Sequence, residues 1–326
     1  MTSLTPAPAL TQHTIGRFLA TVFPDGETVE GEAPLELSSE TSDPPRLAQA
    51  TIIEGRELRA IPLSGPPVVA FAAFLDGRQQ SGVRMYRAGG VPVVFGSTGA
   101  VIRERRNQRM FTWQQRVERR IYVPKKYLSA ADQRALDESG ADVRDTTERE
   151  QEAIEHPLAL RELALHLVRN DRELLEHRVA REWCATETRP LFIDGGIGAA
   201  QPIANSACAI GVVKSHRTLY VSGAALRTTM GLEPGERTSA FKIAPEKRAA
   251  VASWYLRLRN RTGHDPMWGL VRVEVALGRD DDIASRADEV SRWILAETSP
   301  VALPDGRWDK MVYGVRDCEE FLRAVM

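Results

Sequence analysis

Apolar residues gather in a few short runs separated by turn residues, a pattern typical of a sheet that is covered on both faces. Val68–Leu75 is such a run and predicts a buried strand that ends at Asp76 and Gly77. Gly82–Arg87 and Val91–Phe95 predict a second and a third strand, joined by a Gly-Gly turn. We therefore expect an antiparallel meander whose first strand leads into Asp76.

The second half of the chain repeats the combination of a buried strand and an aspartate. Leu158–Trp183 carries an apolar stripe at three- and four-residue steps and predicts a long helix. The strand Leu191–Ile193 follows it and ends at Asp194. Ala207–Val213 and Thr218–Val221 are expected to form a strand pair and Leu270–Leu277 a further strand, and other helices are expected at Arg248–Arg259 and near Cys318–Val325. A strand that follows a meander and a helix can lie parallel to the first strand, which would bring the two aspartates to one edge.

The composition divides the chain into two parts. Residues 1–50 are rich in Pro, Thr, Ser and Glu and predict a partly ordered N-terminal extension, with a possible short strand near Phe18–Phe23. Residues 51–326 are expected to form one α/β domain, interrupted at about 104–185 by a helical insertion. Within that insertion a run of arginines is followed by a run of acidic residues.

Overall composition restricts the class of protein. The chain has 326 residues, of which 43% are hydrophobic and 27% charged, with a net charge of −1, so the average charge predicts no polyanionic partner. The three cysteines show no CxxC spacing and favour neither a disulfide framework nor a zinc site. No signal segment is visible, and no apolar run approaches the about 18 residues of a membrane span. We expect a cytoplasmic protein with no membrane contact.

Asp76 and Asp194 are the first candidates for chemistry. An aspartate just past a buried strand places a carboxylate at the rim of a sheet. Two such carboxylates on neighbouring strands would form an oxygen-rich site for a hard divalent cation, the usual requirement for cutting a phosphodiester. The alternative is that each Asp-Gly pair is an ordinary turn.

Two more residues extend this hypothesis. Glu176 lies at the margin of the apolar stripe of the long helix, from which its carboxylate could reach the rim of the sheet; Glu162, Glu173 and Glu182 are rivals, and an exposed glutamate is the alternative. Lys214 follows an apolar strand and could neutralise a phosphate, or it could be a strand-end lysine whose stem covers apolar surface.

Arg78, which follows the first Asp-Gly pair, and basic residues between the third strand and the acidic run are candidates for DNA binding. With Trp113 as a face on which unpaired bases can stack, they could grip a nucleic-acid backbone. The residues chosen are Arg78, Arg103, Arg105, Arg106, Arg109 and Trp113. Glu104 and Glu118 dilute the charge, so a solvated helix face remains an alternative. No Walker A loop is present, so nothing indicates that the chain hydrolyses ATP.

Several segments resemble the NurA family of DNA-repair nucleases, in the same order along the chain. FAAFLDGRQQSGV and VPVVFGSTGAVIRER are similar to the family's first block. RELLEHRVAREW and LFIDGG are similar to its second block, a helix glutamate before a strand that ends in Asp-Gly. AIGVVKSHRTLYV is similar to its Gly-Val-x-Lys strand, and WYLRLRN with MWGLVRVEVA to a later strand. The resemblance runs from about residue 65 to the end.

The resemblance implies an α/β fold with a ribonuclease H-like mixed sheet, in which an antiparallel meander is joined to parallel strands and flanked by helices. It implies that Asp76, Glu176 and Asp194 bind Mn²⁺ or Mg²⁺ in a DNA exo- or endonuclease. It also implies a homodimer that processes DNA ends for double-strand break repair with a HerA-type hexameric ATPase.

The C-terminal block departs from the family. Where the family carries a tyrosine and a histidine, this chain reads RWDKMVYGVRDCEEFL. Tyr313 corresponds to the aromatic residue, the histidine has no counterpart, and Asp317 is a possible substitute. Three alternatives stay open: a catalytically impaired DNA-binding subunit, an anti-phage nuclease of the same fold, and a related enzyme that acts on RNA.

Overall fold

The structure is a computed structural model that describes residues 10–29, 44–148, 154, 156–246, 248–278, 283–298 and 312–326. Its strands are β1 (Glu27–Thr28), β2 (Arg46–Leu47), β3 (Thr51–Ile52), β4 (Ala60–Pro62), β5 (Ala73–Arg87), β6 (Val91–Arg106), β7 (Arg109–Val123), β8 (Val143–Asp145), β9 (Leu191–Asp194), β10 (Ala209–Val213), β11 (Thr218–Leu219), β12 (Glu236–Thr238), β13 (Phe241–Ile243), β14 (Val251–Arg257) and β15 (Leu270–Ala276). Its helices are α1 (Ile15–Val22), α2 (Ala130–Glu138), α3 (Pro157–Thr186), α4 (Gln201–Ala204), α5 (Gly223–Met230), α6 (Ile283–Glu297) and α7 (Tyr313–Val325), with a short 3-10 helix η2 (Lys125–Tyr127).

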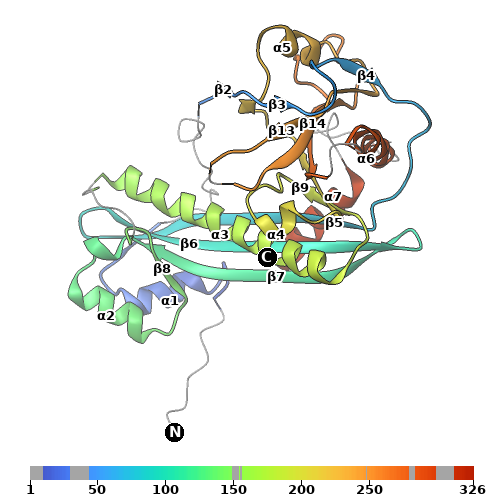
Figure 1. Ribbon diagram of the computed structural model, residues 1–326. Helices are drawn as coiled ribbons and strands as arrows, with labels where there is room; N and C mark the ends of the chain where they lie inside the picture. Colours follow the sequence, from blue (N-terminus) through green and yellow to red (C-terminus); the bar gives the residue numbers. More distant parts are fainter. Residues whose placement is uncertain are drawn as a thin grey trace.

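One large mixed sheet organises these elements. Its path is β3-β13-β14-β15-β10-β9-β5-β6-β7-β8. β5, β6 and β7 form an antiparallel meander, β9 pairs parallel with β5, and β10 pairs parallel with β9. Figure 1 shows the long meander strands across the lower half of the molecule, above α1 and α2, with the later strands of the sheet above them. The order β7-β6-β5-β9-β10 confirms the expected ribonuclease H-like α/β sheet.

The first strand differs from its prediction. β5 begins only at Ala73 and does not end at Asp76; it continues to Arg87 and absorbs the second expected strand. The reason is the pairing of β5 with β6. This pairing runs without a break through Asp76 and Gly77 and continues, after a register shift between Val83 and Met85, to the end of β5. β9 pairs with β5 only up to Leu75, so the sheet opens beside Asp76 although β5 itself continues.

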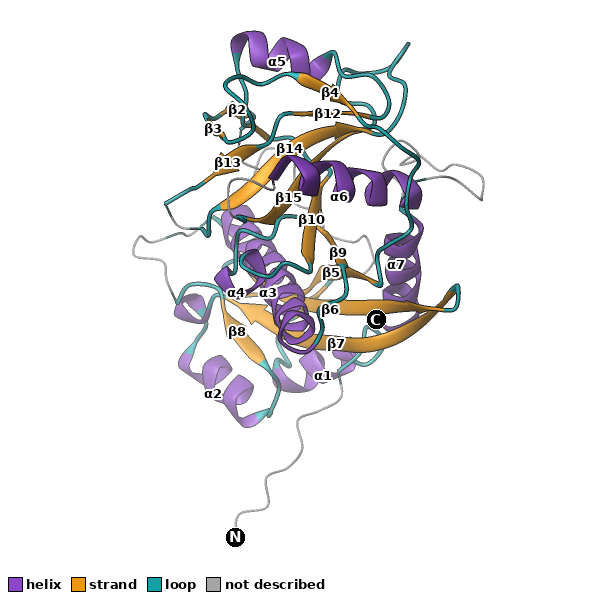
Figure 2. Cartoon of the chain, turned by 45° about the vertical axis from the view of Figure 1, so that its right-hand side comes forward, coloured by secondary structure: helices purple, strands orange, loops and turns teal. Residues whose placement is uncertain are grey.

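Helices cover both faces of the sheet where β5 and β9 meet. Successive residues of a strand point to opposite faces of the sheet, so Phe74 and Leu75 belong to different hydrophobic clusters. Leu75 packs with Val179 of α3, whereas Phe74 packs with Phe192 and with Leu322 of α7. Figure 2 shows α3 on one side of this region and α6 and α7 on the other. This two-sided burial explains the continuous apolar runs of the sequence.

The expected helical insertion at 104–185 is wrong in its first part. Residues 109–123 form the strand β7, since their backbone pairs with β6 almost throughout. The acidic stretch contains the helix α2 and the strand β8. The long helix is confirmed as α3, although Leu174 of its expected apolar stripe is exposed.

Three smaller predictions are also corrected. The region expected to be helical at Arg248–Arg259 contains β14, every residue of which is buried, so no alternation reveals the strand. The possible strand near Phe18–Phe23 falls largely in α1. β11 pairs with β2 and not with β10. Within the described ranges no helix is both long and apolar enough to cross a membrane.

Candidate active site

The pairing of β5 with β9 brings Asp76 and Asp194 together. Phe74 lies opposite Phe192 and Leu75 opposite Ile193, so the next residue of each strand is an aspartate. Asp76 is 9% exposed, and one of its carboxylate oxygens accepts a hydrogen bond of 2.8 Å from the Gly77 amide. The sheet thus places two carboxylates side by side where its strands part.

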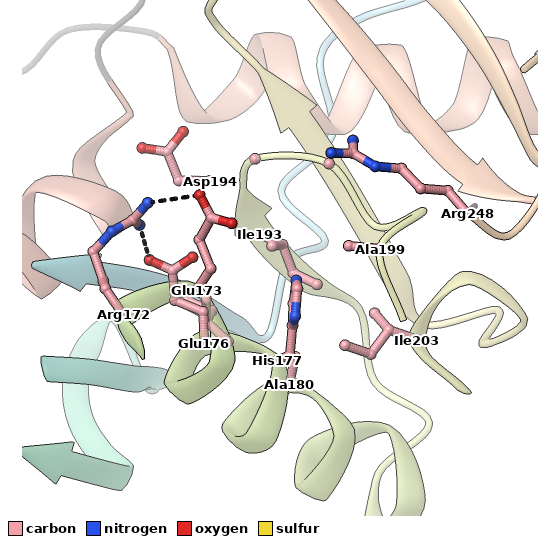
Figure 3. A pocket seen from close by; sticks show the side chains of 13 residues that line it. Arg172, Glu173, Glu176, His177, Ala180, Ile193, Asp194, Ala199, Ile203 and Arg248 are labelled. Atoms are coloured by element: carbon pink, nitrogen blue, oxygen red, sulfur yellow. Dashed lines mark hydrogen bonds and ion pairs between the residues drawn. The ribbon is translucent and has the colours of Figure 1, made fainter. Parts of the chain in front are cut away.

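Glu176 reaches this point from α3. A Cβ added at Gly77 would overlap the Glu176 carboxylate, so the glutamate occupies the space that the glycine leaves. Arg172, one helical turn earlier, forms an ion pair with Glu176 and donates a hydrogen bond of 3.2 Å to Gln79 on β5. Figure 3 shows Arg172 bridging Glu176 and Glu173, with Asp194 beside them.

The other three candidate glutamates of α3, Glu162, Glu173 and Glu182, do not occupy the position of Glu176 beside β5. Glu182 pairs with Arg116 at 2.6 Å and accepts a hydrogen bond from Gln114. Glu173 lines the same pocket as Glu176 but pairs with Arg172 at 3.5 Å and is more exposed. Glu162 does not line this pocket. Glu176 is therefore the α3 glutamate that packs against the strand of Asp76.

Lys214 approaches from the end of β10. Its ammonium lies 2.9 Å from the Asp194 carboxylate, and the side chains are 26% and 21% exposed, respectively. The charge of Lys214 also acts on Asp76, where it lowers the pKa against stronger opposing effects. Asp76, Glu176, Asp194 and Lys214 are thus brought together from four elements of the fold.

Two of these carboxylates, Asp76 and Glu176, have a pKa above the usual value. Burial, reinforced by the negative charges of Asp194 and Glu176, raises the pKa of Asp76 to about 8. Burial raises the pKa of Glu176 to about 7 in spite of the positive charge of Arg172. Burial lowers the pKa of His177, the next residue along α3. Without a cation, this group of carboxylates carries a reduced negative charge at neutral pH.

A pocket of about 200 Å³ opens next to these residues, room for several water molecules. Figure 3 shows Glu176 and Asp194 on one side and Arg248 on another, with His177 between them. Arg172, His177 and Arg248 were not predicted from the sequence. The four-residue spacing of Arg172 and Glu176 on a helix could have indicated that pair, but no sequence signal connects Arg248 with this site.

The chemistry of the donor set suits a hard cation. Three carboxylates supply only oxygen ligands, which Mg²⁺ and Mn²⁺ prefer. Arg172 and Lys214 hold two of these carboxylates. Among the described residues, no group of three His, Cys, Asp or Glu side chains is already gathered as metal ligands. The donors therefore fit a divalent ion in type, and binding would require the carboxylates to exchange these cationic partners.

Most of the expected DNA-binding residues are engaged within the protein. Arg103 pairs with Asp317 of α7 at 2.5 Å, and Arg105 with Glu297 of α6 at 2.7 Å. Trp113 packs edge to face against Trp183 of α3, with ring centroids 5.1 Å apart.

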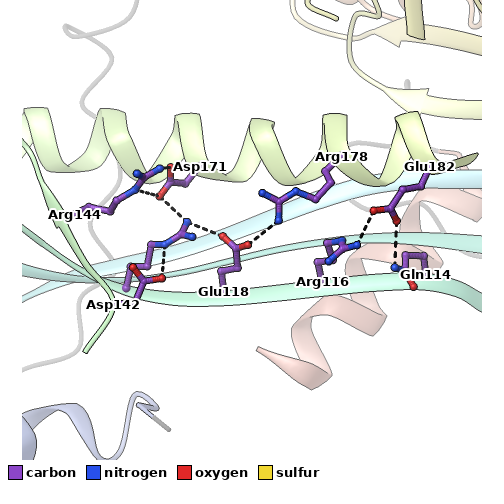
Figure 4. A network of polar contacts seen from close by, with 9 residues as sticks. Gln114, Arg116, Glu118, Asp142, Arg144, Asp171, Arg178 and Glu182 are labelled. Carbon is purple, nitrogen blue, oxygen red and sulfur yellow. Dashed lines mark hydrogen bonds and ion pairs between the residues drawn. The ribbon is translucent and has the colours of Figure 1, made fainter. Parts of the chain in front are cut away.

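The other arginines of the run also have structural roles or lie at the hairpin. Figure 4 shows ion pairs between β7 and α3, such as that of Arg116 with Glu182. Arg120 of β7 also pairs with Asp171 of α3, at 3.0 Å. Arg106 and Arg109 are exposed at the tip of the β6–β7 hairpin, where Arg106 pairs with Glu104 at 2.5 Å. The half-buried Arg78 follows Gly77 on β5.

Part of the C-terminal block lies near Asp76. Cys318 donates a hydrogen bond of 3.3 Å to the Phe74 carbonyl, and burial together with the charges of Asp76 and Asp317 raises its pKa. Asp317 pairs with Arg103, and Tyr313 begins α7. Residues of this block up to 311 lie outside the described residues.

Comparisons with known proteins find a likeness in structure and none in sequence. No family model matches the chain. No curated protein matches it. In structure it is similar to the NurA nuclease from Sulfolobus solfataricus, with a TM-score of 0.45 and 10% identity over 80% of this chain and 82% of that one. A likeness at this level does not place the chain in the family.

Proposed function

We propose that this chain is a metal-dependent deoxyribonuclease that hydrolyses phosphodiesters at DNA ends as an exo- or endonuclease. One observation carries the proposal: Asp76, Glu176 and Asp194, far apart in sequence, converge where two strands part. Burial and neighbouring negative charge both raise the pKa of Asp76, and such a group is costly to fold in its charged form without a cation. Such an arrangement is expected where a divalent ion and a phosphate are to be bound.

In this proposal Asp76, Glu176 and Asp194 hold one or two Mn²⁺ or Mg²⁺ ions. When bound, such ions supply an activated water and neutralise the scissile phosphate. Arg172 orients Glu176 by anchoring α3 to Gln79. Lys214, already drawn to this point by Asp194, balances negative charge when a phosphate enters.

The partners and the setting come from the sequence resemblance. We propose a cytoplasmic homodimer that acts with a HerA-type hexameric ATPase in processing DNA breaks. The absence of a Walker A loop supports dependence on a separate motor. Co-purification of the chain with such an ATPase tests this part, and full processive cleavage by the chain alone would count against it.

The nuclease activity is tested with purified protein and labelled DNA. We expect cleavage with Mn²⁺, none with a chelator, and none by Asp194→Asn, which removes a charge but preserves shape. Asp142→Asn is the matched control, because Asp142 is 52% exposed and lies by β7 and not in this pocket. Full activity of Asp194→Asn would refute the site.

A catalytically impaired DNA-binding subunit is the second candidate. It is favoured by the lack of a gathered three-residue ligand group among the described residues and by the missing family histidine. That protein would bind the labelled DNA and leave it intact with either metal. An anti-phage nuclease of the same fold would cleave in the assay, and protection of cells from phage would distinguish it.

A further inference from the structure

The pocket beside the carboxylates has a second charged wall. Arg248 lies on the loop between β13 and β14 and lines the same pocket as Glu176 and Asp194. Figure 3 shows its side chain extending across the pocket from that loop toward the side on which the carboxylates lie. A cation therefore faces the acidic group from a separate part of the sheet.

The other cations near the carboxylates are already paired. Arg172 binds Glu176, and Lys214 lies 2.9 Å from Asp194. Arg248, in contrast, is exposed and makes no side-chain hydrogen bond or ion pair with the residues that the structure describes. Because no carboxylate of the described residues binds its guanidinium, Arg248 is available to bind a ligand that enters the pocket.

Backbone contacts hold the Arg248 loop against the segment after Asp194. The Ala249 amide donates a hydrogen bond of 2.8 Å to the Gly198 carbonyl. A Cβ at Gly198 would lie 3.2 Å from the Ala249 carbonyl oxygen, so this close approach favours glycine. The Arg248 amide also donates to the Pro245 carbonyl at 3.2 Å. The arginine is thus positioned relative to Asp194 before any ligand binds, which lowers the entropy cost of binding.

We propose that Arg248 binds a backbone phosphate of the DNA substrate next to the scissile phosphate. A guanidinium presents paired donors that match two phosphate oxygens, and its positive charge offsets the repulsion between an entering phosphate and the carboxylates of Glu176 and Asp194. The DNA enters with one phosphate at the carboxylates and a neighbouring phosphate at the opposite wall. This inference rests on the proposed function, and it assigns Arg248 to substrate binding.

The test compares Arg248→Gln with wild type in Mn²⁺-dependent cleavage and in DNA binding at several salt concentrations. We expect about a tenfold higher KM with little change in kcat, because one charged hydrogen-bonded contact is lost. The slope of log affinity against log salt should fall by about one. Arg248→Lys should recover part of the KM. Arg17→Gln, a change at an exposed arginine of α1 on another part of the molecule, is the control.

A second measurement locates the phosphate. Neutral methylphosphonates are placed one at a time along the cleaved strand. One position near the cut should raise the KM of wild type and leave that of Arg248→Gln unchanged. An unchanged KM and salt slope in Arg248→Gln, with wild type active, overturns this inference and leaves the nuclease proposal standing. If wild type neither binds nor cuts DNA with Mn²⁺, the proposed function itself fails.

Discussion

Gly77 leaves the space that the Glu176 carboxylate fills. Gly77 lies inside β5 with an ordinary strand backbone, and a side chain there would collide with the glutamate. Gly77→Ala should therefore displace Glu176 and lower kcat by about a hundredfold, with a loss of about 2 kcal/mol in stability from overpacking. Cleavage assays and thermal melts measure both effects.

Gly82→Ala is the matched control for this prediction. Gly82 lies on the same strand, but its added Cβ would come no closer than 3.7 Å to any other residue's side chain. That variant should cleave DNA like wild type. Normal activity of Gly77→Ala would show that Glu176 need not occupy its observed position.

Metal binding should stabilise the protein through the same carboxylates. Saturating Mn²⁺ is expected to raise Tm by several degrees at pH 8, because an ion that binds only the folded state shifts the unfolding equilibrium. The gain should be smaller at pH 6, since protons on Asp76 and Glu176 must leave before the ion binds. Thermal melts with Mn²⁺ and with EDTA at both pH values measure this. An equal gain in Asp76→Asn would place the ion elsewhere.

Asp76 should also make the metal-free protein less stable as pH rises. Its folded pKa of about 8 lies above the usual 3.8, so the unfolded chain ionises first and stability is lost between these values. Asp76→Asn removes the ionisation and keeps an oxygen to accept the Gly77 amide. In EDTA its Tm relative to wild type should increase from pH 5 to pH 8. A constant difference across that range would contradict the raised pKa.

The sequence indicated the position of the carboxylates better than their local structure. The apolar runs before Asp76 and Asp194 predicted buried strands, the order of the elements allowed these strands to be neighbours, and β5 and β9 are. The glycine after Asp76 was interpreted as a turn, yet Gly77 lies within a strand that continues past the site. An Asp-Gly pair reads the same whether it forms a turn or lies inside a strand, and only the pairing of β5 with β6 shows that this one lies inside a strand.

Other features of the site depend on contacts that no local pattern records. β14 is buried along its whole length, and a short apolar run of that kind does not show whether it is helix or strand. Arg248 reaches the pocket only because its loop binds Gly198, far away in sequence. Arg103 and Arg105 were candidates for DNA binding, whereas their guanidinium groups pair with Asp317 and Glu297 from far along the chain.

Asp171 is expected to anchor α3 to β7. It is 2% exposed, pairs with Arg120 at 3.0 Å and Arg144 at 2.8 Å, and accepts a hydrogen bond from Tyr122 at 2.9 Å. Asp171→Asn should cost about 3 kcal/mol, because the buried group loses its charge-assisted bonds. Urea unfolding measures this. Asp142→Asn, which removes an exposed partner of Arg120, should cost far less.

The effect of Asp171 should depend on pH. Burial opposes its ionisation, but hydrogen bonds from Arg144 and Tyr122 and the charge of Arg120 outweigh burial and lower its pKa. Its contribution to stability is present above the usual pKa of 3.8 and is lost as pH falls through the lower folded value. Wild type and Asp171→Asn should therefore converge in stability below about pH 4. A difference that stays constant into acid would exclude this mechanism.

Arg109, at the tip of the β6–β7 hairpin, should contribute to DNA binding where the paired arginines, Arg106 among them, do not. Figure 2 shows this hairpin reaching beyond the helices, and the left-handed Asn107 and Gln108 turn the chain between exposed Arg106 and Arg109. Arg109→Gln should weaken DNA binding and reduce its salt slope by about one, with no change in Tm. Arg103→Gln should instead lower Tm, because its guanidinium pairs with Asp317 and is 14% exposed. Unchanged DNA binding in Arg109→Gln would show that the hairpin tip does not contact the substrate.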